Sequence, residues 1–199
     1  MNNRGIFLLA VLSIGFTGCV TEKLPPTSTY TLNPDLGVVH SSANTEQRTD
    51  SILMIGRIRS THAFSGTDLI YSDARYGQNS YAYSRWSDSP TTMLLHVFQE
   101  ALEKSGRYMA VVPYSSQSKS DLLLESTLFD FSHHINDDGT SDGILRMRFD
   151  LIDNQTKRVI ATWDFVSSVP ATQLNAQGAA AALNKAVSIL TLDLIEWLR

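Results

Sequence analysis

Cysteine and positive charge are both scarce in this sequence. Cys19 is the only cysteine in 199 residues, so no intramolecular disulfide can form and stability must come from a hydrophobic core. Lysine and arginine number 16 against 20 acidic residues, and nothing in this balance attracts nucleic acid, which binds to a basic face, so we expect no nucleic-acid partner. The roughly 150 residues after position 50 are enough to bury about two thirds of the unfolded chain's surface.

Long hydrophobic runs are missing too. A bilayer span needs about 20 apolar residues, and we expect no segment after residue 18 to cross a membrane. The apolar run 6–16 is also too short to span, but it follows Arg4 and ends in Phe16-Thr17-Gly18-Cys19. A positive start, a short apolar centre and small residues before the cut are typical of a secretory signal. Because a thiolate is a good nucleophile toward an acyl or glyceryl donor, the sequence predicts a lipoprotein signal peptide over 1–18 and lipidation of Cys19.

Residues 19–50 are rich in Ser, Thr, Pro and Asn and poor in large apolar side chains. Such a composition predicts a flexible tether with an average reach of roughly 30 Å. Tyr30-Thr31-Leu32 is the one alternating patch within it, and it can dock on the domain as an edge strand. The mature chain keeps 15 basic residues against 20 acidic ones and is therefore a mildly acidic domain, 51–199, on a lipid anchor.

The periodicity after residue 50 predicts short and long strands with two helices. Ser89 and Pro90 are suited to begin a helix that Gly106 ends, and a second helix begins near Asn175. Alternation in the first long strand separates Leu124, Ser126, Leu128 and Asp130 from the opposite face of Leu123, Thr127, Phe129 and Phe131. This order predicts one α+β domain, a mostly antiparallel twisted sheet with both main helices packed on one face. The expected strands are 52–58, 69–72, 81–83, 122–135, 144–153 and 159–167.

Motifs of catalysis and metal binding are absent. There is no glycine-rich phosphate loop and no serine in a nucleophile-elbow context. His133 and His134 are neighbours in a predicted strand, so they point to opposite faces and cannot easily share a metal ion. The loop 137–143 resembles a calcium loop, but Arg148 stands where that loop needs a glutamate. We therefore expect no enzyme, no metal site and no cofactor.

The most distinctive segment runs from Tyr81 to Pro90. Tyr83, Arg85, Trp86 and Pro90 place aromatic rings, a guanidinium and a helix start close together. One interpretation is a corner between strand and helix, with Trp86 buried, its indole N–H bonded to a carbonyl, and Arg85 stacked on an aromatic ring or paired with Asp88. The other is a partner-binding surface, because Tyr and Trp are common interface anchors.

The order of these features resembles the ABC-type transport auxiliary lipoprotein family, which includes PqiC. The resemblance covers nearly the whole chain. It is carried by the lipidation signal, Tyr30-Thr31-Leu32, the strand 52–58, Tyr71, Tyr83-x-Arg85-Trp86-x-x-x-Pro90, the helix ending at Gly106, Val111-Val112, the strand 121–131, Leu151-x-Asp153 and Arg158-Val159-Ile160.

The resemblance implies a non-catalytic lipoprotein that is anchored in the outer membrane and faces the periplasm. Its implied partners are an MCE-domain periplasmic protein and the components of an inner-membrane ABC transporter, in a lipid transport system that supports envelope integrity. Val20 is consistent with a location in the outer membrane, because aspartate at the position after the lipidated cysteine commonly marks retention in the inner membrane and valine does not. Self-association of the chain is left open. A structural lipoprotein that assists outer-membrane assembly without moving lipid is the alternative, and a hydrolase with an unrecognised site is a third hypothesis.

Overall fold

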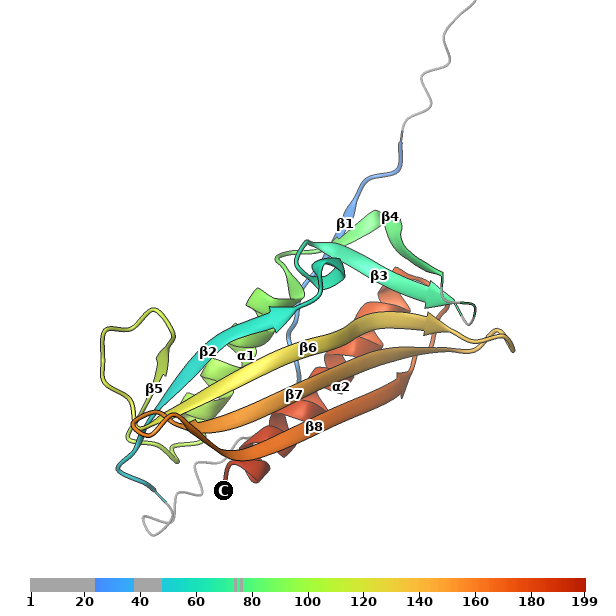
Figure 1. The fold of residues 1–199 in the computed structure, drawn as a ribbon. Helices are drawn as coiled ribbons and strands as arrows, with labels where there is room; N and C mark the ends of the chain where they lie inside the picture. The colour runs from blue at the N-terminus through green and yellow to red at the C-terminus, as the bar shows by residue number, and fades with distance from the viewer. Residues whose placement is uncertain (1–23, 38–47, 74, 76) are drawn as a thin grey trace, which may run out of the picture.

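A computed structural model describes residues 24–37, 48–73, 75 and 77–199. One eight-stranded mixed sheet is covered on one face by two helices, and no helix or strand in these residues covers the other face (Figure 1). The α+β architecture predicted from the sequence is thereby confirmed. Its elements are β1 (Ser28–Tyr30), β2 (Ile52–Ser60), the 3-10 helix η1 (His62–Phe64), β3 (Asp68–Asp73), β4 (Gln78–Trp86), α1 (Pro90–Lys104), β5 (Ala110–Pro113), β6 (Leu122–Ile135), β7 (Ser141–Asp153), β8 (Arg158–Pro170) and α2 (Ala176–Trp197).

The three longest strands form an antiparallel meander, β6-β7-β8. Polar turns join them, as their Asn, Asp and Gly content predicts. Lys157 adopts a left-handed conformation in the second turn, with φ 59°. Within the described chain β8 pairs only with β7, so its other edge is open.

The opposite edge of β6 is shared by two strands in succession. β2 runs parallel to the first half of β6, from Leu53 opposite Leu122 to Ser60 opposite Leu128. After η1 the chain returns to this edge of β6 and forms β3, which runs parallel to the second half of β6 with Tyr71 opposite His133. β5 then extends the sheet from β2, and β4 and β1 extend it from β3. The sheet is therefore mixed, with its longest pairings antiparallel and shorter parallel pairings along one side of β6.

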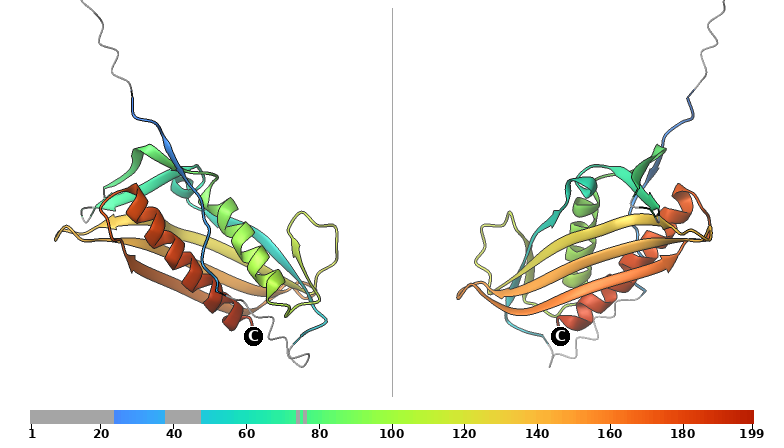
Figure 2. Two further views of the ribbon diagram at one scale, coloured as in Figure 1. Left: turned by 180° about the vertical axis from the view of Figure 1, so that it is seen from behind. Right: turned by 45° about the vertical axis from the view of Figure 1, so that its right-hand side comes forward.

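Both helices pack on the same face of the sheet (Figures 1 and 2). Ser89 caps α1 and Asn175 caps α2, each accepting a backbone N–H from the first turn. By length and composition α2 is apolar enough to cross a membrane, contrary to our expectation for the chain after residue 18. The structure shows a core helix instead, since one side of it is buried against the sheet. The buried positions of α2 are Ala176, Gly178, Ala179, Ala180, Ala182, Leu183, Ala186, Val187, Leu190, Thr191 and Leu194.

A β-bulge in β6 corrects the predicted alternation of its faces. Leu128 pairs with Met147 but Asp130 pairs with Arg146, so Phe129 is an extra residue in β6. From Leu124 to Leu128 the even-numbered side chains share the buried face, but beyond the bulge Phe131, 1% exposed, faces the core in place of Asp130. Phe129 is 38% exposed, with the Arg146 guanidinium 5.4 Å from its ring centroid.

Candidate functional site

The corner between β4 and α1 contains the four residues that the sequence singled out. β4 ends at Trp86, and α1 begins at Pro90, which is buried and occupies the first turn. Between them Ser89 accepts a hydrogen bond from the backbone N–H of Thr92 at 3.3 Å. A cap followed by a proline, which needs no N–H partner, fixes where the helix starts and therefore how the corner turns.

Trp86 lies in the core, with 1% of its surface exposed. Its ring packs on Phe131 of β6 with 5.3 Å between centroids, a distance typical of aromatic pairs. The backbone N–H of Trp86 donates to the carbonyl of Thr67 at 2.8 Å. The indole N–H, however, is buried and has no hydrogen-bond partner among the residues that the structure describes, so the expected bond to a carbonyl is wrong there. The ring enters an apolar layer, where packing rather than hydrogen bonding holds it.

Tyr83 and Arg85 lie on the outside of the same corner. Tyr83 is 42% exposed and Arg85 is also exposed. Neither the stacking nor the ion pair expected for Arg85 occurs in the described part of the chain, and the Asp88 carboxylate accepts the backbone N–H of Ser89 at 2.6 Å instead. The corner therefore combines a buried half, Trp86 and Pro90, with an exposed half, Tyr83 and Arg85.

An irregularity in β4 turns Tyr81 away from this exposed half. Asp68 of β3 lies opposite Arg85 and Ile70 lies opposite Ser80, so β4 uses more residues than β3 over this stretch. The Tyr81 hydroxyl lies 2.7 Å from Nδ1 of His133, a fully buried residue of β6. The Tyr71 ring packs on Tyr81 at 5.0 Å. Nε2 of His133 is buried and has no hydrogen-bond partner within the described part of the chain.

Burial determines the protonation states of Tyr81 and His133. Desolvation, with a smaller contribution from Tyr71, raises the pKa of Tyr81, so the phenol keeps its proton and can donate to Nδ1. Burial also lowers the pKa of His133; the neighbouring His134 lowers it further, and Asp142 opposes the shift. The imidazole is therefore held neutral inside the fold.

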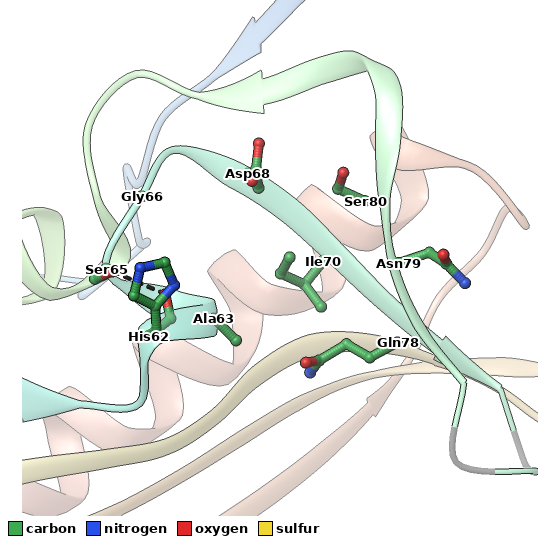
Figure 3. Close-up of a pocket in the computed structure, with 9 residues that line it drawn as sticks. All are labelled: His62, Ala63, Ser65, Gly66, Asp68, Ile70, Gln78, Asn79 and Ser80. Atoms are coloured by element: carbon green, nitrogen blue, oxygen red, sulfur yellow. Dashed lines mark hydrogen bonds between the residues drawn. The ribbon is translucent and has the colours of Figure 1, made fainter.

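A surface hollow of about 530 Å³ lies beside the corner, between η1 and the β3-β4 hairpin (Figure 3). Its lining is mostly polar: His62, Ala63, Ser65, Gly66, Asp68, Ile70, Gln78, Asn79 and Ser80. The Ser65 hydroxyl donates to the main-chain carbonyl of His62 at 2.8 Å rather than to an imidazole nitrogen. Ser65 and His62 therefore do not form a nucleophile and base pair in this geometry.

Comparison with known proteins gives the family. A family model described as "ABC-type transport auxiliary lipoprotein component" matches residues 30–194. The chain belongs to this family. No curated protein matches the lipoprotein's sequence. A crystal structure of a Xanthomonas campestris protein of the family DUF330 is similar to it, with 20% identity, a TM-score of 0.71, and coverage of 87% of this chain and 92% of that one. A second crystal structure, of an uncharacterised protein, has 13% identity, a TM-score of 0.65, and coverage of 88% and 100%.

The structure places the remaining candidate residues of the lipoprotein apart from one another. His134 bonds through Nε2 to Asp130 at 3.0 Å, whereas His133 is fully buried and bonds to Tyr81. In the β6-β7 turn the carboxylate of Asp138 accepts the N–H and hydroxyl of Thr140, so it serves the turn itself. Among the described residues no group of His, Cys, Asp and Glu could hold a metal ion. Cys19 lies outside the described residues.

The buried His133 predicts how the stability of the lipoprotein depends on pH. Its folded-state pKa is lowered, so the unfolded chain binds a proton more readily as pH falls below about 6.5, the ordinary value for histidine. We expect the contribution of His133 to the free energy of unfolding to be constant above this pH. Below it the free energy of unfolding should decrease by at most about 1.4 kcal/mol per pH unit, until the pH reaches the folded-state pKa of His133. Urea unfolding at several pH values measures this slope.

His133→Asn is the matched variant for this experiment, because it keeps a polar group and cannot titrate. Its stability should be lower overall but flat between pH 7 and about 5, where carboxylates, with ordinary pKa values near 4, contribute little. An unchanged slope in His133→Asn would show that another group is responsible.

Proposed function

We propose that this lipoprotein is a non-catalytic subunit of an MCE-type, ABC-powered lipid transport system, anchored by lipid at Cys19 in the outer membrane and facing the periplasm. The family match over residues 30–194 carries the proposal. The signal that precedes it in the sequence supports the anchor, since a short apolar run ends at the single cysteine. Such a subunit contributes to envelope integrity through its position rather than through chemistry.

The proposed organisation keeps the division made from the sequence. Residues 1–18 are the signal peptide, 19–50 the lipidated N-terminus and tether, and 51–199 the transport auxiliary domain. β1 is the part of the tether that joins the sheet. The sequence predicted an edge strand at Tyr30-Thr31-Leu32, and the observed strand begins two residues earlier, at Ser28. Self-association is part of the proposal, because the open edge of β8 can accept a strand from another copy.

The described surface offers several exposed apolar residues for contact with an MCE-domain partner. Met109 is 50% exposed before β5, Ile160 is 55% exposed in β8, and Phe129 lies on the uncovered face of the sheet. These positions sample one end of the domain and its uncovered face, and the folded core does not depend on them. A photo-crosslinking residue at each one therefore reports partners without disturbing the fold.

Crosslinking in intact cells, followed by mass spectrometry of the captured proteins, tests the function. We expect an MCE-domain protein to be captured from at least one of these positions, and the purified chain to begin at acylated Cys19. The Cys19→Ala variant should carry no acyl mass and should lose both membrane attachment and capture. Recovery of outer-membrane assembly components alone, with no lipid transport protein, would favour the assembly lipoprotein over the transport subunit.

A further inference from the structure

The N-terminal segment is built into the domain from β1 onward. β1 pairs parallel with the end of β4, and the carbonyl of Tyr30 accepts the backbone N–H of Ser87 at 2.7 Å. Farther along, Asn184 of α2 accepts the N–H of Asn33 at 2.7 Å and donates to the carbonyl of Thr31 at 3.2 Å. Figure 2 shows this segment running down the helical side of the domain between α1 and α2. The free part of the tether is therefore short.

Only eight residues, 20–27, separate Cys19 from β1. Fully extended they reach at most about 28 Å, and as a flexible coil about 15 Å on average. The start of β8 lies at the other end of the sheet, since Val159 pairs with Ile152, which pairs with Leu123 at the beginning of β6. β3 and β4 join β6 near His133 instead, ten residues or about 33 Å away along the strand.

The surface nearest to the anchor is the outside of the corner between β4 and α1, where β1 pairs with residues 84–86 at the end of β4; we call this surface the β1-β4 corner. It exposes Tyr83 and Arg85, and Leu24, 77% accessible, lies in the segment that leads into β1. Tyrosine suits the boundary between water and a membrane because its ring is apolar and its hydroxyl polar, and arginine binds phosphate groups through its planar guanidinium. Each contact alone is weak, but a short tether makes it intramolecular and so raises its effective concentration.

We propose that the β1-β4 corner is the surface with which the domain contacts the phospholipid bilayer, Tyr83 lying among the headgroups and Arg85 against their phosphates. The inference rests on the proposed lipid anchor at Cys19. It assigns the exposed half of the distinctive corner to the membrane and its buried half to the core. The end of the sheet that carries Ile160 then points away from the bilayer, toward the periplasm.

A single reactive cysteine provides the test, because the native Cys19 is consumed by acylation. Ala82→Cys places a fluorophore at an exposed position of the corner and leaves Tyr83 and Arg85 intact, and Ile160→Cys is the matched position at the far end. The purified, acylated full chain is reconstituted in vesicles of phosphatidylethanolamine and phosphatidylglycerol, some of whose headgroups carry a nitroxide quencher. We expect strong quenching at position 82 and none at position 160.

The outcomes separate the anchor from the orientation. Flotation with the vesicles and the intact mass report on the lipid anchor, and a chain without acyl mass that does not float would overturn both proposals. A floating chain with equal quenching at the two positions, or with stronger quenching at 160, would overturn the orientation alone. Arg85→Glu on the Ala82→Cys background should reduce quenching without shifting the melting temperature; unchanged quenching would exclude the arginine contact.

Discussion

Trp86→Ala is expected to destabilise the domain by about 3–5 kcal/mol, the usual cost of truncating a large core side chain. The ring is 1% exposed and packs on Phe131, a residue that the bulge in β6 turns into the core. Alanine would leave a cavity beneath the corner where β4 passes into α1. Because the exposed half of the corner is held by this ring, the variant should also loosen Tyr83 and Arg85.

Urea unfolding monitored by circular dichroism measures the loss for Trp86→Ala. Trp86→Phe is the matched control, since it keeps an aromatic ring and removes an indole N–H for which the described residues provide no hydrogen-bond partner. We expect Trp86→Phe to lose much less stability than Trp86→Ala. A Trp86→Ala protein that melts together with the wild type would contradict a core role and return this residue to the partner-binding interpretation.

Gly143→Val is expected to cost about 3 kcal/mol or more, at the upper end of what overpacking usually costs. Gly143 of β7 lies directly beneath α2. A Cβ atom there would be 2.8 Å from Cβ of Ala182 and 2.9 Å from the backbone nitrogen of Leu183, distances that force the helix away from the sheet. The backbone of a 22-residue helix cannot yield locally as a flexible side chain can. The free energy of unfolding should fall and the packing of α2 should loosen.

The packing of α2 can be tested by a double-mutant cycle. Gly143→Ala should lose less stability than Gly143→Val. In the double variant, Ala182→Gly should restore part of the stability that Gly143→Ala loses, because it removes the carbon atom nearest to the new Cβ. Gly66→Ala is the control, because no atom of the described residues lies within 4 Å of a Cβ placed at that exposed position. Equal stability of Gly143→Val and wild type would show that the helix does not press on β7 as described.

Local signals in the sequence predicted most elements well. The predicted strand 122–135 has the same limits as β6, and Ser89, Pro90 and Asn175 begin the helices as expected. β5 has only four residues and was not predicted as a strand, because so short a run carries no clear period. The parallel pairing of β2 and β3 with one edge of β6 was also not foreseen, since partners far apart in the sequence leave no local mark.

The sequence by itself determined the helix starts, the limits of β6, the α+β class and the resemblance to a transport auxiliary lipoprotein, whereas β7 and β8 extend up to three residues beyond the predicted strands. These depend on capping, turn residues and periodicity, which act over a few neighbouring residues. Only the tertiary structure decided that Trp86 is buried while Arg85 is exposed, that Phe131 replaces Asp130 in the core, and that β1 pairs in parallel with β4. Each of these depends on strand register and on contacts between distant segments, and one extra residue at a bulge is enough to reverse which side chains face the core.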